Sequence, residues 1–153
     1  MKLGVVMDPI ETINFKKDST LAMMIEAQRK NHEIFYMTPN SLFINSGISY
    51  ATTSKIEVRN DPLDWFSLEE EKIIKLSELD AILMRQDPPF NLEYISTTFI
   101  LESIKNKVKI INNPTSIRNI SEKLYSVKYL RFMPDTIFTQ NIHEIENFFK
   151  KNK

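Results

Sequence analysis

The chain has 153 residues, of which 42% are hydrophobic and 26% charged, and its 20 basic side chains balance its 20 acidic ones. This length predicts one domain that removes about 70% of its unfolded surface from water, and the balanced charge lacks the basic excess of a nucleic-acid-binding protein. No run approaches the roughly 18 apolar residues of a membrane span. With no cysteine, disulfides and thiolate chemistry are excluded. Lys2 leads directly into a short apolar run, so we predict no signal peptide and expect a cytoplasmic protein.

The first part of the chain has the pattern of a β-α-β unit. A continuous apolar run ends at Asp8-Pro9, and a polar loop follows it. Asp18 or Ser19 can then cap a helix, because its side-chain oxygen accepts a hydrogen bond from an otherwise unpaired backbone N–H. The predicted elements are a strand over Lys2–Met7, a helix from Asp18 or Ser19 to about Lys30, and a strand over Glu33–Met37.

The next part of the chain predicts a β-hairpin. Residues 41–58 hold two β-rich stretches around Asn45-Ser46-Gly47, a sequence suited to a tight turn. We expect this hairpin to lie beside the parallel sheet rather than inside it. Residues 60–71 are mostly polar, and we expect the two aromatic residues Trp65 and Phe66 to pin a surface loop to the body of the domain.

The stretch Ala81–Met84 is a continuous apolar run, which is typical of a strand buried in a parallel sheet. Arg85 and Asp87 follow where this strand should end, and Pro88 and Pro89 prevent it from continuing. Ligands of open α/β sheets bind outside the carboxyl ends of strands, and Arg is suited to bidentate carboxylate recognition. The pair therefore predicts a ligand site, although a simple ion pair between the two residues fits the same pattern.

The remaining sequence alternates between helical and extended patterns. The strongest helix has apolar residues at helical spacing, which predicts a buried stripe of Leu92, Ile95, Phe99, Ile100 and Ile104. The predicted elements are a helix over 91–107, a strand over 108–111, a helix over 121–131, a strand over 135–140 and a helix from 141 to 150. The last strand and helix lack a partner strand within the sequence, so we expect the chain to be cut through a second domain.

Several kinds of site are absent from the sequence. Gly4 and Gly47 are its two glycines, so it has neither a P-loop nor a G-x-G-x-x-G phosphate cradle. His32 and His143 are isolated, and neither has the spacing of a metal site or a catalytic triad. We therefore predict no metal-binding and no catalytic residue in this segment.

Two further groups of polar residues are candidates for ligand binding. Asn14, Lys17 and Ser19 follow the first strand and precede a helix N-terminus, where anions are favoured. From composition alone, an ordinary cap in a polar loop is the favoured explanation for these residues. Lys123 stands at the start of a predicted helix, where it fits either a phosphate contact or a solvated lysine. The residues alone thus predict a doubly wound, mainly parallel α/β domain with an inserted β-hairpin, and they name no reaction.

Four stretches together resemble bacterial glutathione synthetases. The resemblance covers essentially the whole chain in order. Its most specific part is the combination of a Lys-Lys-Asp-Ser loop with a Met-Arg-x-Asp-Pro-Pro-Phe segment. The matching residues are Lys2–Pro9 with Ile10, Ile13, Asn14 and Lys16–Ser19; Trp65-Phe66; Leu83–Phe90; and Asn113-Pro114, Ser116–Arg118 and Glu122–Leu124.

The resemblance implies an ATP-grasp ligase that joins γ-glutamylcysteine to glycine, with ATP and Mg²⁺, through an acyl phosphate. It implies a Rossmann-like, pre-ATP-grasp substrate domain over 1–133 and the start of a truncated ATP-grasp domain over 134–153. Lys123 matches a lysine that reaches the nucleotide. Asp87 is expected to orient Arg85. The residues that match the peptide-substrate site are Ile13, Asn14, Ser19 and Arg85.

The family continues into elements that these residues do not contain. They are a lysine-bearing strand, a glycine-rich loop over the phosphates, and acidic and Asn ligands for Mg²⁺. We therefore expect the chain alone to be inactive and to need a complementary ATP-grasp chain, and the resemblance implies a homo-oligomer. Two alternatives are a non-catalytic domain that binds γ-glutamyl peptides and a remnant that has kept an interaction surface. Neither nucleic acid nor a membrane is an expected partner.

Overall fold

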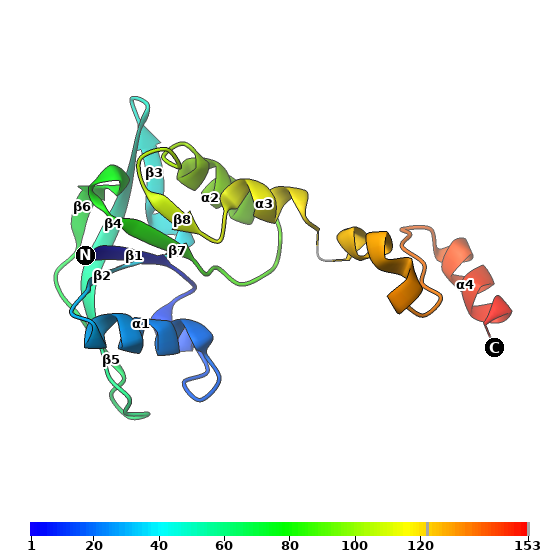
Figure 1. The fold of residues 1–153 in the computed structure, drawn as a ribbon, viewed down its shortest axis with the longest axis horizontal. Coiled ribbons are helices and arrows are strands. Elements are labelled where there is room, and N and C mark those ends of the chain that lie inside the picture. The colour runs from blue at the N-terminus through cyan, green and yellow to red at the C-terminus, as the bar shows by residue number, and fades with distance from the viewer. Residues whose placement is uncertain (122, 153) are drawn as a thin grey trace. The chain divides into compact units, whose positions relative to one another are not determined.

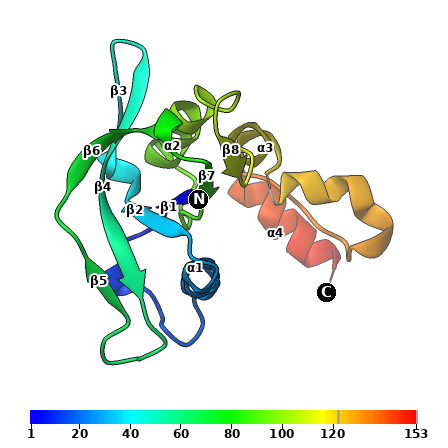
Figure 2. The same cartoon turned by 60° about the vertical axis from the view of Figure 1, so that its left-hand side comes forward.

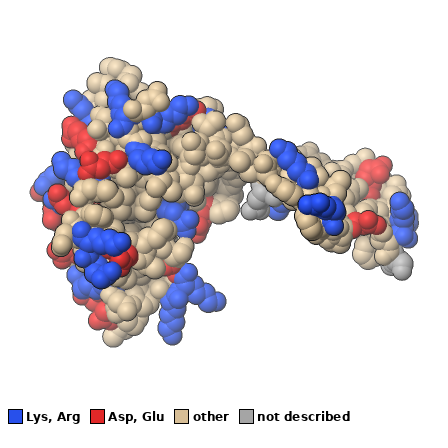
Figure 3. Space-filling model, in the orientation of Figure 1, with Lys and Arg blue, Asp and Glu red and all other residues tan. Residues whose placement is uncertain are grey.

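The structure, a computed structural model, describes residues 1–121 and 123–152 (Figure 1). The chain divides into two compact units, Met1–Arg118 and Asn119–Lys153. In the described part, no helix has the length and apolar character needed to cross a membrane. On the face of the first unit shown in Figure 3, basic and acidic side chains are interspersed rather than gathered by sign.

The first unit is built on an eight-stranded sheet with the order β3-β4-β2-β1-β7-β8, and β5 and β6 also pair with β4. Parallel strands form one half: β1 (Lys2–Val6), β2 (Glu33–Met37), β7 (Ala81–Met84) and β8 (Lys109–Ile111). Antiparallel strands form the other: β3 (Leu42–Asn45), β4 (Ile48–Val58), β5 (Phe66–Leu68) and β6 (Lys72–Lys75). The predicted α/β class is confirmed, and the sheet is mixed.

Helices cover both faces of the parallel strands (Figures 1 and 2). Helix α1 (Ser19–Arg29) lies on one side, and α2 (Leu92–Glu102) lies on the other. Two hydrophobic clusters result, because successive side chains of β1 point to opposite faces. The sequence did not predict α3 (Pro114–Asn119) or three short 3₁₀ helices over Ile10–Thr12, Pro39–Ser41 and Leu76–Glu78.

Gly4 has little free space around it in this packing. A Cβ at this position would stand 2.7 Å from Leu79 Cδ1 and 2.7 Å from Met37 Cε. The other glycine, Gly47, has a φ of 76° in the turn of the β3–β4 hairpin. Both glycines thus have structural roles.

The hairpin and the following loop largely follow the prediction. Strand β4 pairs with β2, the outermost strand of the parallel half, so the hairpin continues the sheet beyond its parallel strands. The Trp65 indole N–H donates to the Ile10 carbonyl at 3.3 Å, and its ring centroid lies 6.1 Å from that of Phe15. Trp65 and Phe66 both pack against the core, which confirms that they hold the loop to the body.

The buried face of α2 differs from the predicted stripe. Leu92 is 80% exposed and Phe99 is 57% exposed, while Thr97, Thr98 and Leu101 are buried. The helix also ends at Glu102, and turns rather than helix lead to β8. The prediction was wrong for Leu92 and Phe99, whereas Ile104 is buried and Ile100 packs against the core. Thr97 and Thr98 can be buried because their hydroxyls donate to backbone carbonyls four and three residues earlier, respectively.

The second unit contains a 3₁₀ helix over Leu124–Phe132, where we predicted an α-helix, and α4 (Ile142–Lys151). The 3₁₀ helix is kinked at Tyr129, and Glu122 lies outside the described residues. The predicted strand over 135–140 is wrong, because this segment forms only bends and irregular backbone. Helix α4 is confirmed, with Asn141 Oδ1 accepting from the His143 N–H at 3.0 Å.

Candidate functional site

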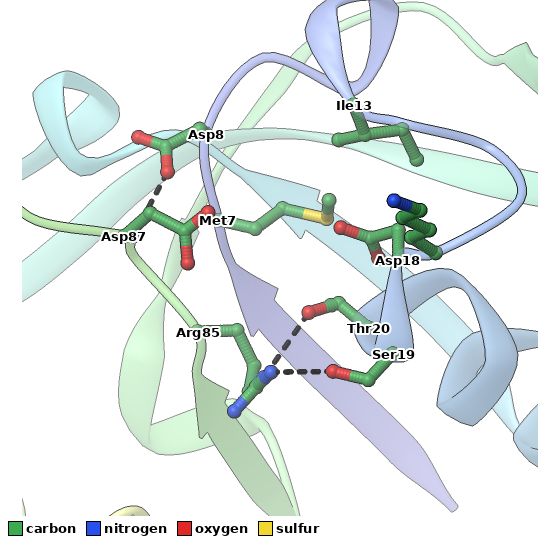
Figure 4. A pocket seen from close by; sticks show the side chains of 9 residues that line it. Met7, Asp8, Ile13, Asp18, Ser19, Thr20, Arg85 and Asp87 are labelled. Carbon is green, nitrogen blue, oxygen red and sulfur yellow. Dashed lines mark hydrogen bonds between the residues drawn. The ribbon is translucent and has the colours of Figure 1, made fainter.

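The candidate site lies where β1 and β7 leave the sheet. These strands are parallel neighbours with Val6 opposite Met84, so the residues that follow them emerge at the same edge. A cavity of about 250 Å³ opens there, beside the N-terminus of α1 (Figure 4). It is lined by Met7, Asp8, Ile13, Lys17, Asp18, Ser19, Thr20, Arg85 and Asp87.

Arg85 is held by the first two residues of α1. Its Nε donates to Thr20 Oγ1 at 3.1 Å and its Nη2 donates to Ser19 Oγ at 2.8 Å. Its backbone N–H also donates to the Val6 carbonyl at 2.7 Å. Thr20 is buried, with 3% of its surface exposed. The guanidinium is therefore fixed at the cavity, with Nη1 unused by any hydrogen bond that we find among residues 1–121 and 123–152.

Asp87 does not have the expected contact with Arg85. Its backbone N–H donates to Asp8 Oδ2 at 2.8 Å, which joins the ends of β7 and β1. Among the described residues, no salt bridge involves Asp8, Arg85 or Asp87. Ser19 and Thr20 orient Arg85 in place of Asp87.

The loop between β1 and α1 closes the other side of the cavity. The Asn14 carbonyl accepts from the N–H groups of Lys17 and Asp18, both at 2.9 Å, which folds the loop back on itself. Asp18 Oδ1 accepts from the Leu21 N–H at 2.6 Å and caps α1, as predicted. A second cavity of about 410 Å³ adjoins the first. It is lined by Asp8, Thr12, Ile13, Asn14, Lys17, Asp18 and Asp87.

The structure thus brings together six residues that the sequence singled out, since each lines one or both cavities. They are Ile13, Asn14, Lys17, Ser19, Arg85 and Asp87. Their role in substrate binding stays a prediction. Lys123 belongs to the second unit, where it precedes the 3₁₀ helix and its carbonyl accepts from Ser126. Its contact with a nucleotide also stays a prediction.

Two tyrosines near the site were missed by the sequence analysis. Burial raises the pKa of the Tyr94 hydroxyl, the Asp87 and Asp8 carboxylates raise it further, and Arg85 opposes them. Burial likewise raises the pKa of Tyr36, whose hydroxyl accepts from the Ile10 N–H at 3.1 Å. Tyr94 lies in the first turn of the helix capped by Asn91, shortly after Pro88-Pro89. This position near the end of a predicted strand could have marked it as a site residue. No sequence feature marked Tyr36 as a site residue, because its pattern is that of an ordinary strand residue.

Thr20 was also missed, although it is the most buried polar contact of Arg85. Its position in the Asp-Ser-Thr sequence at the start of α1 could have marked it as a site residue. No group of three or more His, Cys, Asp or Glu residues in the described part could hold a metal ion.

Comparison with known proteins assigns the family. A family model described as "Prokaryotic glutathione synthetase, N-terminal domain" matches residues 1–118. The chain belongs to this family. The matched segment contains the whole of the first unit, including both cavities.

Several curated relatives are named glutathione synthetase. The chain is 47% identical over 152 residues to that of Buchnera aphidicola subsp. Schizaphis graminum, covering 99% of this chain and 48% of the relative. It is 47% identical to that of Vibrio cholerae, covering 97% of this chain and 47% of the relative. It is 42% identical to that of Photorhabdus laumondii, covering 99% and 48%. The chain spans about half the length of the curated relatives it matches.

Proposed function

We propose that this chain is the substrate-binding part of an ATP-dependent ligase that joins γ-glutamylcysteine to glycine. Its membership of the prokaryotic glutathione synthetase N-terminal domain family supports this reaction. The observation that carries the binding role is the fixed guanidinium of Arg85 at a strand-end cavity. Arg recognises carboxylates through parallel hydrogen bonds, and γ-glutamylcysteine has two carboxylates.

In this proposal, the chain's own residues bind and orient the peptide. Arg85 holds a substrate carboxylate, Ser19 adds a hydroxyl at the N-terminus of α1, and Ile13 and Asn14 form the loop over it. When bound, ATP and Mg²⁺ would supply the phosphoryl group that activates the cysteinyl carboxylate as an acyl phosphate for attack by glycine. Such positioning accelerates a reaction by removing the entropic cost of bringing the groups together.

The nucleotide chemistry needs residues beyond those of the first unit. Both glycines have structural roles, so no glycine-rich loop is available among these 153 residues to hold phosphates. We propose that residues 1–133 act as the substrate domain and that 134–153 begin an ATP-grasp domain, with Lys123 reaching the nucleotide. A complementary ATP-grasp chain would complete the site, in a cytoplasmic and homo-oligomeric enzyme. Alone, the chain would bind the peptide and form no glutathione.

The test is calorimetric titration of the purified chain with γ-glutamylcysteine, repeated on Arg85→Ala. Circular dichroism checks that each protein is folded. We expect binding that Arg85→Ala abolishes. The matched control is Arg59→Ala, because Arg59 pairs with Asp64 on an exposed loop and should leave binding unchanged. A folded wild-type chain that fails to bind γ-glutamylcysteine would refute the proposed role.

The catalytic part of the proposal has its own test. The chain is mixed with ATP, Mg²⁺, glycine and γ-glutamylcysteine, with and without the half of the Buchnera relative that it does not match. We expect glutathione only when that half is present, and none when Arg85→Ala replaces the wild-type chain. Glutathione formed by the chain alone would show that the catalytic groups lie within these 153 residues.

A further inference from the structure

Strand β6 is an edge strand of the first unit. It pairs antiparallel with β4, and no other strand in the described part of the chain pairs with it. Figures 1 and 2 both show it at the margin of the first unit. The N–H and C=O groups on the free side of an edge strand have no strand to pair with, which makes the edge a template for another chain. This edge of the sheet can therefore accept a further strand.

An apolar side chain is exposed on this edge. Ile73 is 64% exposed, whereas its neighbour Ile74 packs against the core on the other face of the strand. Lys72 and Lys75 are exposed as well. A second strand placed beside β6 would remove part of the Ile73 side chain from water, which favours association.

Charges of opposite sign lie on either side of Ile73. Glu71 immediately precedes the strand and Lys75 ends it, and alternate side chains of an extended chain share a face. Glu71, Ile73 and Lys75 therefore form a row of acid, apolar residue and base. Among the described residues, no salt bridge involves Glu71 or Lys75. Edge lysines discourage pairing where they meet each other, so the result depends on which residues a second strand brings opposite them.

Twofold symmetry restricts how two copies of β6 can pair. In an antiparallel pair of identical strands related by a twofold axis, the residue on the axis lies opposite its own copy. An axis at Lys72 or Lys75 brings two lysines together, and an axis at Ile74 pairs no opposite charges. An axis at Ile73 sets Glu71 of each copy opposite Lys75 of the other. Charge complementarity therefore selects a second copy of this chain and one register.

We propose that two copies of this chain dimerise by antiparallel pairing of β6, with Ile73 on the twofold axis and Glu71 of each copy paired with Lys75 of the other. Leu76 begins a 3₁₀ helix, so pairing that is symmetric about Ile73 spans residues 71–75. An interface of this size makes a weak dimer whose population depends on concentration. The contact uses none of the residues that line the two cavities at the β1–β7 edge.

The first test reverses the charges and measures the dimer of the full chain by analytical ultracentrifugation. Glu71→Lys and Lys75→Glu each bring like charges together at both ends of the paired segment. We expect each to weaken dimerisation about tenfold or more, because like charges placed opposite each other are costly. A mixture of the two variants should dimerise again, since one chain then carries lysine and the other glutamate at both positions. The double variant Glu71→Lys/Lys75→Glu should also recover the dimer.

The second test reads the register through a disulfide. The chain has no cysteine, so a single introduced cysteine can be oxidised only against its own copy. Residues opposite each other in an antiparallel pair have Cα atoms about 4.5–5.5 Å apart, within the range that a disulfide bridges. We expect Ile73→Cys to form a covalent dimer. Lys72→Cys should not, because in this register the two copies of residue 72 lie beyond the roughly 7 Å that a disulfide allows.

The matched control is Lys109→Glu, which reverses an exposed charge in the edge strand β8 and should leave the dimer unchanged. Three results would overturn the inference: a wild-type chain that stays monomeric over about a hundredfold range of concentration, equal cross-linking of Ile73→Cys and Lys72→Cys, or single-charge variants that do not dimerise when mixed. Species larger than a dimer would also overturn it, because they show that β6 pairs with a different strand. None of these results bears on the binding of γ-glutamylcysteine, so the proposed function is tested separately.

Discussion

Replacing Thr20 with Val tests whether this residue positions Arg85. Valine has nearly the shape of threonine, so the substitution removes a hydroxyl without opening a cavity. Thr20 Oγ1 lies 3.1 Å from Arg85 Nε, and Thr20 is only 3% exposed, so water cannot easily replace the lost acceptor. A hydrogen bond to a charged group contributes about 1.5–3 kcal/mol when buried. Because Arg85 is partly exposed, we expect a loss of about 1 kcal/mol in the free energy of unfolding.

The loss of binding free energy for γ-glutamylcysteine should exceed this loss of folding stability. With one of its two orienting hydroxyls removed, the guanidinium must be ordered by the ligand itself, which lowers affinity. We expect about tenfold weaker binding of γ-glutamylcysteine, measured by calorimetry, and rescue by Thr20→Ser, which restores the hydroxyl. The matched control is Thr53→Val, since Thr53 is also 3% exposed and its hydroxyl donates to the Tyr36 carbonyl at 2.6 Å.

Urea unfolding and titration together separate the two variants. Thr53→Val should lose about 1 kcal/mol of stability and keep its affinity for γ-glutamylcysteine. Thr20→Val should lose both stability and affinity. If Thr20→Val binds as tightly as Thr20→Ser, Arg85 does not depend on this hydroxyl and the positioning argument is refuted.

Three further predictions concern stability and are checked by urea unfolding. Gly4→Ala should cost about 1–3 kcal/mol, because the new Cβ would stand 2.7 Å from side-chain atoms on both sides; no loss would show that these atoms move aside freely. Asp18→Ala should cost about 1 kcal/mol through loss of the α1 cap, and an unchanged midpoint would contradict the capping role. Hydrogen bonds from Thr115, Lys105 and Arg118 lower the pKa of Glu102 to about 2 from an ordinary 4.5. The stability that they contribute is therefore present above about pH 4.5 and lost as the pH falls towards 2. Wild type should lose more stability than Glu102→Gln between pH 5 and 2.5, and equal losses would contradict this assignment.

The parallel half of the sheet could be predicted because its strands are short apolar runs with unambiguous ends. Ala81–Met84 is bounded by Arg85, and Glu33–Met37 ends before Pro39, so composition alone marks both. Strands β5 and β6 were missed because they are only three and four residues long and stay largely exposed. They are strands only because the long β4 offers hydrogen-bonding partners along its length. The segment 135–140 shows the converse, since its strand-like composition meets no such partner in the described structure.

The wrong face of α2 has a different cause. Periodicity ranks residues by hydrophobicity, and the exposed Leu92 and Phe99 outrank the buried Thr97 and Thr98 on any such scale. The structure reverses this order because Arg118 donates to Thr98 Oγ1 at 2.9 Å and lies 4.1 Å over the Phe99 ring. Arg118 lies in α3, which the sequence did not predict, so this partner could not be anticipated.

For the site too, local sequence patterns could be recognised, whereas the contacts between distant residues could not. Arg85 and the Asp18–Thr20 segment were each recognisable, because one ends an apolar run and the other starts a helix. Their contact spans 65 residues of sequence and depends on the register that sets Val6 opposite Met84. A shift of that register would remove Thr20 from Arg85, and the most obvious neighbour in sequence, Asp87, would then be the natural ion-pair partner. The sequence allowed either a ligand site or an ion pair between Arg85 and Asp87. Among the described residues this ion pair does not form, and Arg85 contacts Ser19 and Thr20 instead.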